Sequence, residues 1–116
     1  HAVEELSIPT GAGLTIDLQT LVNTLDGTLG AAKIRGLWIE AAADNDAAIT
    51  VAPGASAPWL GLLSSSTSGL FLRAGELHLF ASKTGWDVSG SSKTIKLTHG
   101  GGGAQIVKLV ILAATA

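Results

Sequence analysis

Several residue types that carry protein chemistry are missing or scarce in this sequence. Its 116 residues include no Cys, no Met and no Tyr, and the only aromatic residues are three Trp and two Phe. Without cysteine the chain can form no disulfide, no thiolate metal site and no cysteine nucleophile. Charged residues make up 14% of the chain, whereas an ordinary soluble domain has about 25%.

Basic charge and long apolar runs are lacking as well. Seven Lys and Arg stand against nine Asp and Glu, a net charge of −2. Because no excess of positive charge is available to neutralise phosphates, we expect no nucleic-acid partner. The longest apolar run, Ile106 to Ala114, is interrupted by Lys108. It is far shorter than the roughly 20 residues of a membrane-spanning helix, so we expect no membrane partner.

Small and apolar residues are abundant instead. Hydrophobic residues make up 47% and there are 15 Gly, with a mean hydropathy of +0.44. A surface with so few charges is easily desolvated, which favours a subunit packed against neighbouring molecules. A monomer with a surface rich in Gly, Ser and Thr is the alternative. The length fits a single domain over residues 1–116.

The hydrophobic pattern repeats mostly every second residue, which is the period of a β-strand. Strands are expected near 6–8 and at 14–18, 33–40, 49–51, 70–73, 76–81, 94–98 and 106–112. Residues 18–25 also fit helical spacing, so this stretch is either a helix of two turns or a loop. The pattern predicts an all-β fold: a seven- to eight-stranded antiparallel β-sandwich, jelly-roll-like, with at most one short helix.

The alternation also predicts which side chains face the core. The expected core residues are Ile16, Leu37, Ile39, Ile49, Val51, Leu77, Leu79, Ile95, Leu97, Val107, Leu109 and Ile111. His78 and Phe80 then lie on the outward side of their strand.

One strand has a break of phase. The apolar positions on either side of Gly36 are out of step, because Ile34 precedes it and Leu37 follows it. A bulge at Arg35 and Gly36 would restore one inward face, and Trp38 would then point outward. A strand buried on both faces is the alternative.

Two stretches resemble ligand-binding loops but lack the required spacing. The run Gly100 to Gly103 leads into a strand without the Lys-Ser/Thr of a phosphate-binding loop, so we expect a hairpin tip between the last two strands. Asp44-Asn45-Asp46 opens like a calcium loop, but Ile49 and Ala55 occupy the positions of its Gly and Glu, so we expect a plain turn. The three histidines have no zinc-site spacing. We expect neither a metal nor a cofactor.

A catalytic centre is not indicated either. Nucleophilic catalysis by serine needs a base and an orienting acid held beside it. The sequence contains no Gly-x-Ser-x-Gly elbow and no Ser-x-x-Lys motif. The carboxylates are scattered along the chain. We therefore expect a protein that is not an enzyme.

The tryptophans indicate contacts. Trp86 follows a glycine between two expected strands, which favours a structural anchor at the sandwich edge. The loop around Trp59 is too apolar to be free, which indicates either a subunit contact or core packing. The loop residues concerned are Pro58, Trp59, Leu60, Leu62 and Leu63. Trp38 or Trp59 could also be the stacking platform of a carbohydrate-binding or fibre-associated β-domain, which is the alternative function.

The last expected strand is apolar on both faces. In a two-layer sandwich one face of a strand meets the core and the other meets water or a partner. Ile106, Val110 and Leu112 share the second face, and water is a poor environment for all three. Together with Trp38 and the loop around Trp59 they form a candidate subunit or capsid interface, so we expect a homo-oligomer. The alternative is that residues 18–32 cover this face within one monomer.

The order of several landmarks points to a family. They are Lys33 to Glu40, Pro58-Trp59-Leu60-Gly61, Leu72 to Leu77, Thr84-Gly85-Trp86-Asp87-Val88, Ile95 to Thr98 and Ile106 to Ile111. This order resembles small structural proteins of tailed bacteriophages, of the capsid decoration (cement) or minor head type. Ala104-Gln105 replaces the usual Tyr-Asp before the last strand. The resemblance implies a β-sandwich subunit of the virion surface, often oligomeric, with no catalytic residues to carry over.

The resulting hypothesis is a decoration subunit that binds the outer surface of a phage head and stabilises it. A ligand that binds only the assembled lattice stabilises that lattice by mass action. The expected partners are the major capsid protein and further copies of the chain, and the expected location is the capsid surface of the virion. Dimers are the commonest closed assemblies, so the trimer that we favour is implied by the resemblance.

Overall fold

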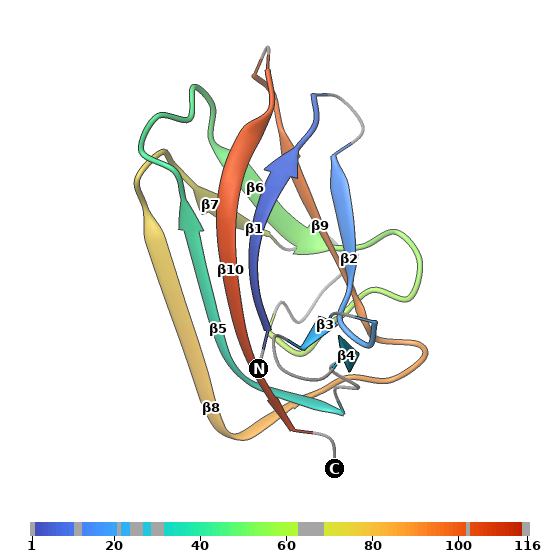
Figure 1. Cartoon of the computed structure of the whole chain (residues 1–116). Helices are drawn as coiled ribbons and strands as arrows, with labels where there is room; N and C mark the ends of the chain where they lie inside the picture. The colour runs from blue at the N-terminus through green and yellow to red at the C-terminus, as the bar shows by residue number, and fades with distance from the viewer. Residues whose placement is uncertain are drawn as a thin grey trace.

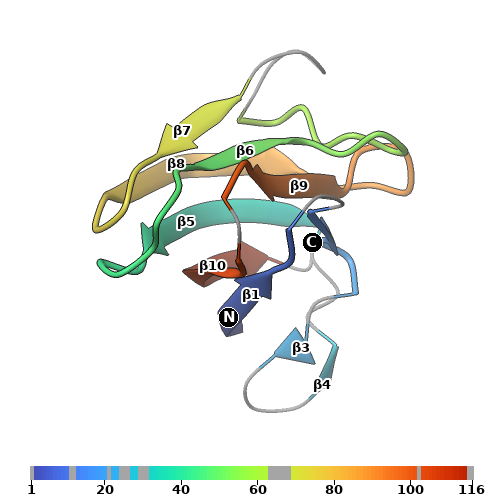
Figure 2. The same ribbon diagram turned by 90° about the horizontal axis from the view of Figure 1, so that it is seen from above.

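Two four-stranded antiparallel sheets face each other as a sandwich in the computed structural model of the chain (Figures 1 and 2). The structure describes residues 2–10, 13–20, 22–23, 27–28, 32–62, 69–101 and 103–114. The first sheet has the order β1 (Ala2–Ile8), β10 (Gln105–Ala114), β5 (Lys33–Ala41) and β8 (Leu77–Asp87). The second has the order β2 (Leu14–Asp17), β9 (Thr94–His99), β6 (Ile49–Pro53) and β7 (Leu70–Leu72).

The strands are nested in the order of a jelly roll. The pairs β1–β10, β2–β9, β5–β8 and β6–β7 are all antiparallel, so the outermost strands in the sequence pair first and the innermost last. This is the pairing of a long hairpin folded over into two sheets. The predicted all-β, jelly-roll-like sandwich is confirmed.

The nesting corrects one expectation about the loops. Because β9 and β10 belong to different sheets, the glycine run from Gly100 crosses between the layers and does not close a hairpin. The turn at Asp44 to Asp46 also joins the two sheets. It is closed by the Asn45 N–H, which donates to the carbonyl of Ala42 at 3.2 Å.

The described residues of the stretch that could have been helical form a turn and a short strand. Leu18 to Thr20 form a turn after β2, and the Thr20 N–H donates to the Asp17 carbonyl at 3.2 Å. The strands β3 (Val22–Asn23) and β4 (Gly27–Thr28) then pair with each other beside the sandwich (Figure 2). The part of the chain that the structure describes contains no helix, and therefore none that could cross a membrane.

The core lies between the sheets and follows the alternation for most strands. Ten of the twelve expected core residues are buried: Ile16, Leu37, Ile39, Ile49, Val51, Ile95, Leu97, Val107, Leu109 and Ile111. The expectation is wrong for β8, where Leu77 is 47% and Leu79 is 65% exposed. His78 and Phe80 are half-buried instead, and Phe80 packs against the core.

The predicted bulge in β5 is confirmed. Leu112 of β10 pairs with Gly36 while the next residue pairs with Ile34, so Arg35 is the extra residue of the bulge. Arg35 is exposed, whereas Ile34 and Leu37 are both buried. The bulge therefore shifts the phase once and keeps a single inward face.

Side-chain amides fasten the start of β10 to the turn after β5. Asn45 bonds the backbone of Ile106 twice: its Nδ2 donates to the carbonyl at 2.8 Å, and its Oδ1 accepts from the N–H at 2.9 Å. The buried Gln105 accepts from the Asp46 N–H at 2.9 Å and donates to the Asp46 carboxylate. These bonds satisfy polar groups where the chain crosses between sheets.

Candidate interaction surface

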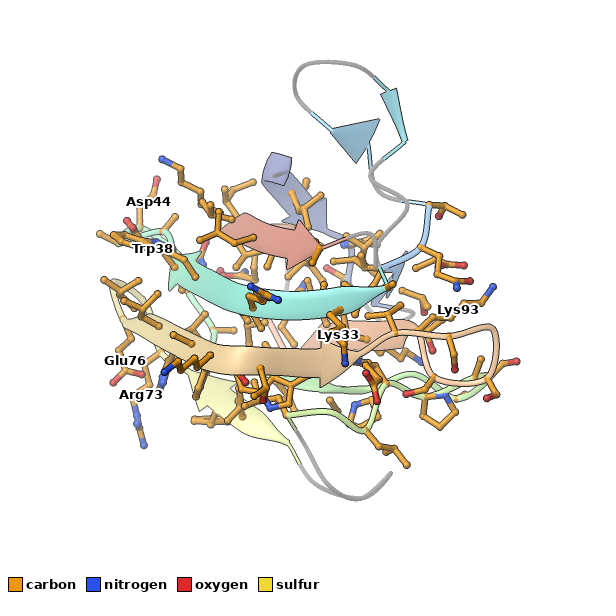
Figure 3. All side chains as sticks on the ribbon, turned by 90° about the horizontal axis from the view of Figure 1, so that it is seen from below. Lys33, Trp38, Asp44, Arg73, Glu76 and Lys93 are labelled. Atoms are coloured by element: carbon orange, nitrogen blue, oxygen red, sulfur yellow. The ribbon has the colours of Figure 1, made fainter. Side chains whose placement is uncertain are left out.

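The outer face of the first sheet carries a set of apolar side chains, all of them exposed except Val110, which is half-buried. We call this the apolar face and define it as Trp38 of β5, Leu77 and Leu79 of β8, and Val110 and Leu112 of β10. Their positions follow from the register, because Val110 pairs with Trp38 and Trp38 pairs with Leu79. Residues paired across neighbouring strands point to the same side of a sheet. Figure 3 shows Trp38 near one end of β5, with Lys33 of the same strand toward the other end.

A groove runs across the apolar face. It is lined by Gly36, Leu37, Trp38, Leu79, Val110 and Leu112 and has a volume of about 120 Å³. Ligand pockets usually have roughly 300–1,000 Å³, whereas a cavity of about 150 Å³ accepts one benzene ring. The groove therefore fits a single apolar side chain of a partner better than a small-molecule ligand.

Gly36 leaves the space for this groove. A Cβ atom built at Gly36 would lie 3.1 Å from Leu112 Cδ1. The φ of Gly36 is not positive, so this glycine is not required by backbone conformation. Its absent side chain opens the groove between Trp38 and Leu112.

The apolar face borders a polar row that carries both signs of charge. Lys108 of β10 pairs in register with Glu40 of β5, and Glu40 pairs with Leu77. Glu40 Oε1 accepts a hydrogen bond from Trp38 Nε1 at 3.3 Å. Within the described residues no salt bridge joins Lys108 to Glu40. An apolar centre beside polar, charged residues is the anatomy of a protein interface.

The outer face of the second sheet has a different character. Thr15 pairs with Lys96, and Thr50 pairs with Thr98, so small hydroxyl side chains and one lysine occupy this side. Phe71 is the large apolar exception, 54% exposed. The guanidinium of Arg73 lies 5.2 Å from the centroid of its ring, a cation–π contact that suits an exposed aromatic. The two faces of one small domain thus differ sharply.

The structure brings together only part of the expected interface. Trp38, Val110 and Leu112 line one groove. Ile106 is half-buried. It lies two residues before Lys108, on the same side of β10 as Lys108 and Val110. Leu112 is 55% exposed, so no described residue covers this end of the face.

The loop around Trp59 lies elsewhere, and the expectation that Trp59 contacts a partner is wrong. Trp59 is 1% exposed. Its Nε1 donates to the carbonyl of Asp87 at 3.0 Å, and its ring meets Trp86 edge-on with centroids 6.2 Å apart. The core packing that the sequence left open is correct, and Trp59 offers no platform to a sugar. Trp86 is the expected anchor, packed against the core.

The neighbours of Trp59 divide between core and surface. Pro58 is half-buried and forms a bridge with Thr94 of β9. Leu62 packs against the core, while Leu60 is 40% exposed. Leu63 lies outside the residues that the structure describes. These residues do not extend the apolar face.

Three residues of this surface were not expected there from the sequence. Gly36 and Leu79 line the groove, and Leu77 lies beside it. In Leu77-His78-Leu79-Phe80 each side of the strand carries at least one large apolar residue, so alternation alone cannot decide which side is buried. The outward position of Trp38 was predicted, and pairing Leu79 with Trp38 would have placed both on one face. That pairing was the missing information.

The described residues hold no cluster of metal-ligating side chains. No three His, Asp or Glu side chains gather there in a way that could hold a metal ion. Both ring nitrogens of His99 are engaged by the fold: Nε2 bonds to the Ile8 carbonyl at 2.8 Å, and Nδ1 accepts from the Gly101 N–H at 3.1 Å. His99 therefore ties β1 to the connection after β9.

Comparisons with protein-family models, with curated proteins and with solved structures find no match for this chain.

Proposed function

We propose that the protein is a virion structural protein, a decoration (cement) subunit that binds the outer surface of a phage head and stabilises it. The observation that supports this proposal is the contrast between the two outer faces. The first sheet exposes the apolar face, while the second exposes mainly threonines and Lys96. A monomer that only met water would gain nothing from displaying Trp38, Leu79 and Leu112 together.

The jelly-roll fold and the apolar face both suit this function. Jelly rolls serve in viral capsid proteins and also in lectins, although a fold alone does not define a function. A decoration protein acts by burial: it gains affinity from an apolar surface and stabilises only the assembled lattice to which it binds. The partners in this proposal are the major capsid protein and further copies of the chain, with a trimer favoured.

The apolar face supplies the affinity in this proposal. Aromatic residues at the centre of an interface usually dominate its binding energy. Trp38 is central here, because it lies between Val110 and Leu79 in register and beside the groove. Replacing Trp38 with Ser should cost about 2 kcal/mol of binding, roughly thirtyfold in Kd.

The test combines location with matched variants. Cryo-EM of purified virions should show the protein on the outside of the head. Recombinant protein is then mixed with heads assembled from the major capsid protein encoded beside it. Trp38→Ser and Leu112→Ser should weaken binding, whereas Phe71→Ser should not. Phe71 is the matched control, since its exposed fraction of 54% is close to the 55% of Leu112. Absence from virions, or equal binding by all three variants, would refute the proposal.

Oligomerisation is tested separately by light scattering. The double change Ile106→Ser with Val110→Ser alters two half-buried residues on the outer side of β10. If the trimer contact uses this side, the variant should have a lower mass than the wild type. An unchanged mass, or a monomeric wild type, would exclude this contact. Binding of the isolated protein to a glycan array would favour the carbohydrate-binding alternative.

A further inference from the structure

The β8 strand is a long free edge of the first sheet. It spans Leu77–Asp87 and pairs only with β5 among the described residues. Natural proteins usually protect such edges with Pro, with charged residues or by covering them. The regular part of β8, residues 77–81, contains no Pro, Lys, Arg, Asp or Glu. Lys83 is the first charged residue after it.

The hydrogen bonds identify which backbone groups point away from the sheet. The Ala41 N–H donates to the Glu76 carbonyl at 3.0 Å, and the Ala41 carbonyl accepts from the Gly75 N–H at 3.1 Å, so the backbone groups of Ala41 point to the β8 side of β5. Bonded and non-bonded pairs alternate along an antiparallel ladder. The N–H and carbonyl groups of Leu77, Leu79 and Ala81 therefore point to the free edge.

The other side of β5 supports this assignment. The Ala42 N–H donates to the Ile106 carbonyl of β10 at 3.1 Å. From Gly36 to Ala41, after the bulge, the backbone groups of even-numbered residues therefore point to β10, and those of odd-numbered residues point to β8. The backbone N–H and carbonyl of Trp38 point to β10. Trp38 and Leu79 are therefore a non-hydrogen-bonded pair, and the N–H and carbonyl of Leu79 point away from β5.

We propose that this edge pairs with β8 of a second copy of the chain, antiparallel and centred on Leu79. In that register Leu79 meets Leu79, and Leu77 meets Ala81. All three residues with free backbone groups then bond across the contact. The first sheets of the two copies then form one continuous sheet, and paired residues of the two copies have their side chains on the same side of it.

A second copy suits this edge better than an arbitrary peptide. A twofold axis through Leu79 matches outward residues with outward residues and places half-buried His78 opposite half-buried Phe80. Residues 77–81 carry no Lys, Arg, Asp or Glu, so no like charges face each other within the paired stretch, and self-complementarity is what a twofold contact requires.

The β8 contact does not require the proposed head contact, although Leu77 and Leu79 belong to both surfaces. The contact uses backbone groups at the edge, whereas head binding is assigned to side chains of the apolar face. Both contacts can exist together, in which case the β8 contact would join two trimers.

The absence of cysteine provides a clean test. A Leu79→Cys variant carries a single thiol, and a short bis-maleimide linker should join two copies through it. Phe71→Cys, exposed on the other sheet, is the control and should form no covalent dimer. Failure of Leu79→Cys to crosslink at the highest soluble concentration would overturn the proposal.

Two further changes separate the edge from the apolar face. Ala81→Pro removes an outward N–H without removing a bond to β5, as edge strands tolerate. Combined with Leu79→Cys it should abolish crosslinking, while Ala81→Ser, which keeps the N–H, should not. Gly36→Val fills the groove and should also leave crosslinking intact. Crosslinking that survives Ala81→Pro, or is lost with Gly36→Val, would contradict pairing through the edge.

Hydrogen exchange on the wild-type protein gives a readout that does not depend on the proline variant folding. The amides of Leu77, Leu79 and Ala81 should exchange more slowly as protein concentration rises. The amides of His78 and Phe80, already bonded to β5, should change less. Exchange at Leu79 that is independent of concentration would refute the pairing. Head binding is measured in parallel, so the failure of one proposal is distinguishable from the failure of the other.

Discussion

The reversed face of β8 can be tested with two leucines that differ in burial. Leu79 is 65% exposed and Leu109 is 2% exposed, although alternation in the sequence assigns both to the core. Changing each to Ala removes the same atoms. Fully burying a leucine contributes about 1.5–3 kcal/mol, and about a third of Leu79 is buried. Leu79→Ala should therefore lower the free energy of unfolding by roughly 0.5–1 kcal/mol.

Leu109→Ala should cost much more, because the core around it cannot collapse fully onto the cavity. The expected loss is about 2–5 kcal/mol, and each kcal/mol lowers Tm by roughly 4 °C in a domain of this size. Urea unfolding, followed by circular dichroism, gives both values. The protein must be dilute enough for light scattering to report a monomer, since self-association would bury Leu79. Equal losses for the two variants would show that Leu79 lies in the core and that the face assignment is wrong.

Three smaller predictions concern the remaining framework and are checked by thermal unfolding. Gly85 has a φ of 85° and a Cβ there would lie 3.0 Å from Lys33 Cβ, so Gly85→Ala should cost about 1–2 kcal/mol, while the unobstructed Gly90→Ala should be near neutral. Asn45→Ala removes two hydrogen bonds to Ile106 and should cost about 1–3 kcal/mol; Asn45→Asp keeps the acceptor but turns a carboxylate oxygen toward the Ile106 carbonyl, so it should cost no less. Trp59→Phe loses the bond to the Asp87 carbonyl and should cost about 1–3 kcal/mol, with loss of the most buried component of the tryptophan fluorescence. A stable Gly85→Ala, Asn45→Ala or Trp59→Phe variant would contradict the corresponding contact.

Much of the fold could be predicted because most strands have one clearly apolar side. In β6, Ile49 and Val51 alternate with less apolar residues, and both are buried. The bulge could be predicted because the phase break around Gly36 has only a few physical solutions. These features depend on neighbouring residues in the sequence, so local pattern was sufficient.

The connections could not be predicted in the same way. A glycine-rich turn between two strands has the same chemistry whether the strands pair or belong to different sheets. The buried Gln105 and the bonds of Asn45 to Ile106 are contacts across 59 and 61 residues of sequence. Such contacts follow from the jelly-roll nesting, which depends on the whole chain.

The error at β8 has a physical cause that also bears on function. Leu77 and Leu79 are as hydrophobic as core residues, yet pairing with outward-facing Trp38 and Glu40 places them outside. Local pattern fails where a sequence serves something other than its own core, and such failures are expected at functional surfaces. The two leucines that the pattern assigned to the interior lie beside the groove and at the free edge. The same residues therefore connect the wrong core prediction, the proposed binding face and the proposed pairing of two copies.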